Sequence, residues 1–169
     1  MRSRSNVTWF STKVRYQKTM EDGSEKVVTE NYLVDALSFT EAESAITDEM
    51  SVYVSGEFQV SGIAKAAYNE VFFSDVDDDK WYKAKLQFIT IDEKTEKEKR
   101  STVNYLVQAK SLARALRYVD EEMGKTMIDY DTIGLNETNL MDVFEHQAPN
   151  KEEKNDVPEY EQGNAEQPA

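Results

Sequence analysis

The stretch Asn31-Tyr32-Leu33-Val34 decides the fold, because it returns unchanged as Asn104-Tyr105-Leu106-Val107. The match continues downstream at the same spacing, where Ala36, Ala42 and Met50 meet Ala109, Ala115 and Met123. Upstream the spacing shortens by one residue, and Trp9-Phe10 aligns with Trp81-Tyr82. This self-similarity indicates that one unit of about 70 residues occurs twice. The alternative is two unrelated strand–helix units that share only their residue propensities.

Each copy begins with two predicted strands. The first strands cover 9–18 and 81–90, and the second cover 26–36 and about 99–109. Alternation places Phe10, Val14 and Tyr16 on one face of the first strand, and Tyr82, Leu86 and Phe88 on the matching face of its counterpart. The turn between the strands has an Asp22-Gly23 hairpin signal in the first copy and is longer and charged in the second.

A helix is predicted after the second strand of each copy. In the first copy Thr40 and Glu43 form a capping box before an apolar stripe of Ala42, Ala45, Ile46 and Met50. In the second copy Ser111 caps a helix that Gly124 ends. Its apolar stripe consists of Leu112, Ala115, Leu116, Val119 and Met123.

Another extended segment follows each helix, at 57–73 and 126–144. Gly62 and Gly134 lie near the middle of these segments, which predicts a bend, a bulge or a split into two strands. The fold class is therefore α+β: an internal duplication of a β-β-α-β unit with antiparallel sheets, two helices and a pseudo-twofold axis.

The predicted organisation follows from these boundaries. It comprises an N-terminal arm (1–8), repeat unit 1 (9–73), an acidic linker (74–80), repeat unit 2 (81–144) and a disordered acidic tail (145–169). The two units are expected to form one compact fold that shares a core.

The charge of the chain is strongly acidic. The formal net charge is −13, of which the tail carries −5 and residues 1–144 carry −8. No apolar run approaches the length of a membrane span, no signal peptide is predicted, and the chain has no cysteine. We therefore expect a cytoplasmic protein without membrane contact, and a nucleic-acid site only where a local basic face opposes the overall charge.

Catalytic and cofactor motifs are absent from the sequence. The single histidine, His146, lies at the start of the tail, and no glycine-rich loop follows a strand. Asp75-x-Asp77-x-Asp79 resembles the start of a calcium loop, but Lys80 stands where the loop needs glycine and Leu86 where it needs glutamate. No metal, cofactor or enzymatic activity is expected.

The first strand of each copy carries the candidate binding residues. Alternation places Trp9, Lys13 and Arg15 on the face opposite the core residues, and Trp81, Lys83 and Lys85 on the matching face of the second copy. Single-stranded nucleic acids are bound by aromatic rings that stack on bases and by cations that follow the phosphates. The sequence therefore predicts single-stranded DNA or RNA as the ligand.

Other readings of these residues remain open. Both tryptophans can pack under the helices or between the copies, and lysines on an exposed strand are also ordinary edge protection. The acidic tail fits a host or replication protein as partner, and a homo-oligomer is possible. A second hypothesis is a phage or mobile-element accessory protein that binds a host protein through its acidic surface, as a nucleic-acid mimic. A structural or assembly role is the third.

The run Trp9-Phe10-x-x-Lys13-Val14-Arg15-Tyr16, with Thr19–Gly23, Tyr32–Glu43 and Trp81–Leu86, resembles an uncharacterised family of about 150 residues. That family, a domain of unknown function, occurs in Bacteroidetes and their phages. The resemblance covers residues 9–144 and implies such an origin without assigning any site. The doubled sheet-plus-helix unit is also similar in architecture to Whirly and Pur-alpha single-strand binders, although their units have four strands before each helix.

Overall fold

The structure is a computed structural model that describes residues 1–75 and 77–146. After β1 (Arg2–Ser5), the first unit contains β2 (Trp9–Thr19), β3 (Glu25–Asp35), α1 (Phe39–Tyr53), β4 (Phe58–Ala66) and β5 (Glu70–Phe73). The second contains β6 (Lys80–Ile91), β7 (Glu98–Ala109), α2 (Leu112–Met123), β8 (Asp129–Glu137) and β9 (Leu140–Phe144). The same order of elements occurs twice, so the α+β fold and its internal duplication are confirmed.

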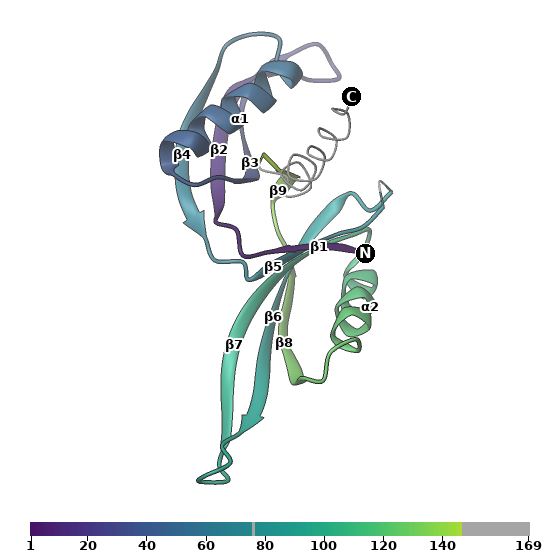
Figure 1. Cartoon of the computed structure of the whole chain (residues 1–169). Coiled ribbons are helices and arrows are strands. Elements are labelled where there is room, and N and C mark those ends of the chain that lie inside the picture. Colours follow the sequence, from purple (N-terminus) through teal and green to yellow (C-terminus); the bar gives the residue numbers. More distant parts are fainter. Residues whose placement is uncertain (76, 147–169) are drawn as a thin grey trace, which may run out of the picture.

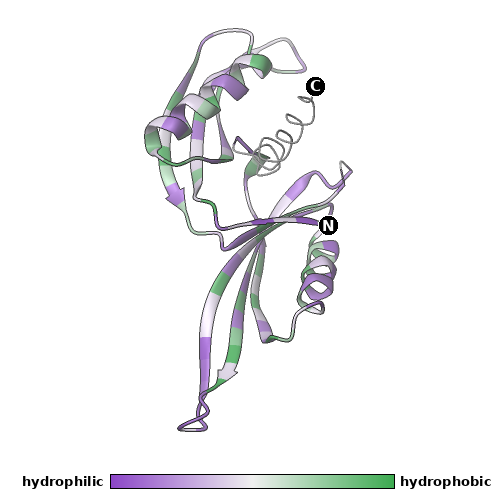
Figure 2. Cartoon of the chain, viewed as in Figure 1, coloured by the Kyte–Doolittle hydropathy of each residue, from purple (hydrophilic) through white to green (hydrophobic). Residues whose placement is uncertain are grey.

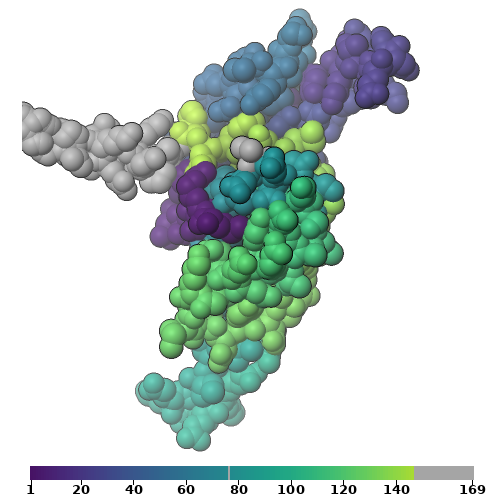
Figure 3. Space-filling model, turned by 90° about the vertical axis from the view of Figure 1, so that its right-hand side faces the viewer, coloured from purple at the N-terminus to yellow at the C-terminus, as the bar shows by residue number. Residues whose placement is uncertain are grey.

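Two sheets are formed, and each contains the last strand of the other unit (Figure 1). One sheet has the order β4-β2-β3-β9, and the other has the order β1-β5-β7-β6-β8. The exchanged strands β9 and β5 run parallel to β3 and β7. Both sheets are therefore mixed, which corrects the expectation of antiparallel sheets. In Figure 3 the yellow-green end of the second unit lies against the blue first unit, as this exchange requires.

The bend predicted in the third extended segments has two parts. Ser61 and Ile133 are extra residues in β4 and β8, because the register shifts between Lys13 and Val14 and between Lys85 and Leu86. These bulges lie beside Gly62 and Gly134, as predicted. Each segment is also split, since three residues separate β4 from β5 and two separate β8 from β9. The split lets the last strand leave its own sheet.

Each helix covers one face of its own sheet. Ile46 and Met50 of α1 pack with Val14 and Val34 of the sheet beneath it. Val119 and Met123 of α2 pack in the same way with Leu86 and Val107. The predicted stripe of α1 is buried, but two members of the α2 stripe are not: Leu112 is 50% exposed and Leu116 is 41% exposed. The stripe of α2 is thus wider than the sheet beneath it can cover.

The helix ends differ in one respect from the prediction. Ser38, not Thr40, caps α1: its hydroxyl accepts a hydrogen bond from the Glu41 N–H, and the Glu41 carboxylate accepts one from the Leu37 N–H. The capping interaction therefore lies two residues before the predicted Thr40–Glu43 pair. Ser111 caps α2 and Gly124 ends it, as predicted.

The chain ends are tied to the fold by charged groups. Arg4 on β1 is buried and forms ion pairs with the buried Asp35 at the end of β3 and with Glu145 after β9. The His146 N–H also donates to Asp35. Residues 145 and 146, assigned above to the tail, therefore contact the folded part, and the predicted disorder of 147–169 lies outside the described residues. In the part of the chain that the structure describes, neither helix has the length and apolar character of a membrane-crossing segment.

Candidate nucleic-acid interface

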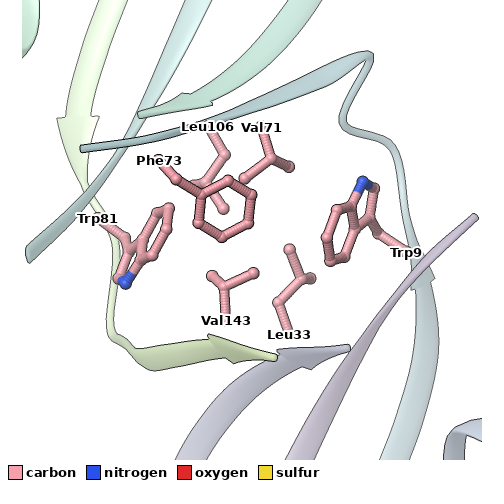
Figure 4. Close-up of a cluster of buried hydrophobic side chains, with 7 residues drawn as sticks. All are labelled: Trp9, Leu33, Val71, Phe73, Trp81, Leu106 and Val143. Atoms are coloured by element: carbon pink, nitrogen blue, oxygen red, sulfur yellow. The ribbon is translucent and has the colours of Figure 1, made fainter. Parts of the chain in front are cut away.

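The two tryptophans of the candidate site are buried and cannot stack on bases. Trp9 is 1% exposed and Trp81 is 2% exposed. Both belong to one hydrophobic cluster (Figure 4) with Leu33, Val71, Phe73, Leu106 and Val143. This burial corrects the prediction that Trp9 and Trp81 form an aromatic platform, and it supports the alternative in which they pack between the copies.

The cluster forms where the helix-free faces of the two sheets meet. Trp9 and Trp81 lie on opposite sides of it, with Leu33, Val143 and Phe73 between them (Figure 4). The rings of Phe73 and Trp81 meet edge to face, with 5.5 Å between their centroids. Alternation correctly places both indoles on the face opposite the helices. That face is closed at the tryptophan end because the exchanged strands bring the other sheet against it.

The four cations of the candidate site remain on the open part of these faces. Lys13 and Arg15 flank Val14, which packs under α1, and Lys83 and Lys85 flank Ala84, which packs under α2. All four side chains are exposed and point away from the helices. Among the described residues, none of the four lies within 4.0 Å of a carboxylate, and so none is held in an ion pair.

The cross-strand neighbours of these cations are uncharged. Lys13 pairs with Asn31, Arg15 with Thr29 and Gln59, Lys85 with Asn104, and Lys83 with Leu106 and Asn136. Directly opposite residues share a face of the sheet, so their charges would act on the cations most strongly. None of these cations therefore lies directly opposite a carboxylate, although the chain as a whole is acidic and Glu57 lines the same hollow as Arg15.

Comparison with known proteins places the chain in a family. The profile of the domain of unknown function DUF4494 matches residues 8–146. The chain belongs to the DUF4494 family. No curated protein and no solved structure shows significant similarity to it. The family description agrees with the resemblance of the sequence to an uncharacterised domain, and it assigns no residue a role.

The cations at the far ends of the sheets do not extend the basic faces of this DUF4494 chain. Lys18 is 3.5 Å from Glu30, and Arg100 is paired with Glu98 and Asp131. The tip of the β6–β7 hairpin is strongly hydrophilic (Figure 2), but its acidic and basic residues are equal in number from Asp92 to Arg100. The hairpin is therefore charged without being basic.

A pocket of about 250 Å³ lies at the junction of the two units and was not predicted from the sequence. Ser11 and Lys83, which occupy equivalent positions in the two copies, both line it. Tyr68 also lines the pocket, and burial raises the pKa of its hydroxyl. Asn104 lines it as well, and its buried side-chain oxygen has no hydrogen-bond partner among the described residues. The equivalence of Ser11 and Lys83 in the repeat is the only sequence signal that relates residues of this pocket to one another.

Proposed function

We propose that this chain is a non-enzymatic binding protein that holds single-stranded DNA or RNA along the helix-free faces of its two sheets. One observation carries the proposal: Lys13, Arg15, Lys83 and Lys85 are exposed, form no ion pair among the described residues and have uncharged cross-strand partners, in a chain of net charge −13. Cations without an ion-pair partner remain available to attract phosphates.

The burial of the tryptophans changes the mode of binding. Base stacking contributes about 1–3 kcal/mol per base in single-strand binders, and Trp9 and Trp81 cannot supply it. The interaction proposed here is therefore electrostatic, weakly dependent on base sequence and steeply dependent on salt. For single strands each neutralised phosphate adds about 0.7 to the logarithmic salt slope, so four contacts give a slope of about 3.

The site is tested by fluorescence anisotropy with labelled oligo-dT at low salt, using the full chain and a chain that ends at His146. The Lys13→Glu/Lys85→Glu variant reverses two charges on the helix-free faces. The matched control is Lys26→Glu/Lys110→Glu, which reverses two exposed lysines that lie elsewhere. We expect the first variant to weaken binding by at least about tenfold more than the control, because it also repels phosphate. No binding by either wild-type chain would refute the proposal, and equal effects of the two variants would place the site elsewhere.

A second proposal is supported by the net charge of −8 on residues 1–144. In this proposal the chain is an accessory protein of a Bacteroidetes phage or mobile element and acts in the cytoplasm. It would bind a host or replication protein through its acidic surface in place of nucleic acid. The anisotropy titration separates the two proposals, because a nucleic-acid mimic does not bind oligo-dT.

A further inference from the structure

The second unit has an apolar groove between α2 and the edge strand β8. Its volume is about 740 Å³, and Leu112, Leu116, Ile133 and Leu135 contribute to its lining. Leu112, Leu116 and Ile133 are 50%, 41% and 47% exposed. Strand β8 is the last strand of its sheet, so one row of its backbone N–H and C=O groups has no ladder partner among the described residues.

The first unit provides an internal comparison, because the same place there is more polar. Glu43 on α1 is equivalent to Leu116, and Ser61, the extra residue of the β4 bulge, is equivalent to Ile133. The residue equivalent to Leu112 is Phe39, which is also 50% exposed although its ring packs against Phe10 with 5.0 Å between centroids. The two units therefore differ at Leu116 and Ile133, whose counterparts are polar, and not at Leu112. The second unit therefore has more exposed apolar side chains at this place than the first, as expected of a binding site.

We propose that this groove binds an extended peptide of another protein, which adds as a strand to β8. A helix beside a free edge strand is suited to this mode of recognition: the strand supplies main-chain hydrogen bonds, and the groove receives alternate side chains. Because successive side chains of a strand point to opposite faces, every second residue of the peptide would face α2. The apolar lining selects aliphatic residues at those positions.

Charge indicates the remaining residues of the peptide. Strand β8 carries Asp129 and Glu137, together with Asp131, which is paired with Arg100, and it has no lysine or arginine. Asp120, which accepts a hydrogen bond from the Tyr130 hydroxyl, also borders the groove. An incoming strand with lysine or arginine between its aliphatic residues complements this edge. A second copy of the chain does not: antiparallel pairing of two β8 strands about Ile133 would place Asp129 opposite Glu137, and like charges at opposite positions are destabilising.

The proposal is tested by selection from a random dodecapeptide phage-display library on the full chain. The key variant is Leu116→Glu/Ile133→Ser, which places the residues of the first unit in the groove. Both positions are exposed, so the fold is retained, and circular dichroism checks this. The control, Glu43→Ala/Ser61→Ala, alters the equivalent surface of the first unit. We expect the selected peptides to alternate aliphatic and basic residues. The groove variant should bind them about tenfold or more weakly, because two apolar side chains that the peptide would bury are lost. The control should bind them with the affinity of the wild-type chain.

Two further measurements test the proposal without the groove variant. Amide hydrogen exchange should slow in β8 when a selected peptide is added to the wild-type chain, because its free N–H groups become bonded. Asp129→Lys should weaken the same peptides, by a factor that falls as salt is added. The proposal is overturned if no peptide is enriched, if selected peptides bind the groove variant equally well, or if the wild-type chain forms a dimer that this variant loses.

Discussion

Trp9 and Trp81 pack between the two sheets, and their indole rings stabilise the fold by filling the space there. The free energy of unfolding should fall by about 3–5 kcal/mol in Trp81→Ala, because the lost indole leaves a cavity between Phe73 and Val143. Lys85→Ala, on the same strand and face, should change it by no more than about 0.5 kcal/mol, since Lys85 is exposed. Urea titration followed by far-ultraviolet circular dichroism measures both.

Trp81→Phe is the control for volume, and it should be less destabilising than the alanine variant because it leaves the smaller cavity. If Trp81→Ala instead has the stability of wild type and loses only oligo-dT binding, the indole is a ligand contact rather than a packing residue.

Glu70 on β5 should make stability depend on pH. Its pKa is raised above the usual 4.5, mainly by burial and further by the charge of Glu122. A raised carboxyl pKa means that the ionised form is disfavoured in the folded state, so the fold loses stability as the pH rises through that pKa. Glu70→Gln should therefore raise the melting temperature at pH 7, and the difference should disappear near pH 4. A difference of equal size at both pH values would exclude this cause. Glu93→Gln, in the exposed hairpin turn, is the control.

The residues themselves explain why the candidate site was predicted only in part. Alternation along β2 and β6 is a property of the single strand, so the sequence correctly separates Lys13 and Lys85 from the helix side. Whether a face is open depends on what covers it. The signal for a covered face was the unbroken run Tyr32-Leu33-Val34, because a strand buried on both faces has apolar residues at consecutive positions. Leu33 is fully buried in the same cluster as Trp9.

At the scale of the element, Ser38 and Thr40 are the two candidate capping residues at the start of α1, and their variants should differ in stability. Ser38→Ala should destabilise the protein by about 0.5–2 kcal/mol, because its hydroxyl accepts the otherwise unbonded Glu41 N–H. Thr40→Ala should have little effect, since Thr40 is exposed and lies inside the helix. Thermal unfolding of the two variants compares them directly. A larger loss of stability in Thr40→Ala than in Ser38→Ala would support the Thr40–Glu43 capping box predicted from the sequence.

The strands β5 and β9 mark the limit of prediction at this scale. The sequence indicates that each third segment bends or splits at or near its glycine, but a split strand can pair in either sheet. The choice depends on contacts distant in sequence, such as Val143 against Leu33 and Val71 against Leu106. No local propensity encodes such a pairing.

The whole molecule is held together by exchange, which predicts that neither half folds alone. Residues 1–79 lack β9 and leave β5 without β7, and residues 80–169 lack β5 and leave β9 without β3. Each half would also expose its part of the cluster around Trp9 and Trp81. The separate halves should therefore lack cooperative unfolding, whereas the full chain should show one transition that coincides for tryptophan fluorescence and circular dichroism. Tryptophan fluorescence reports only on the shared cluster and circular dichroism on all elements. Two separate transitions in the full chain, or a cooperatively folded half, would mean that the exchanged strands do not couple the units.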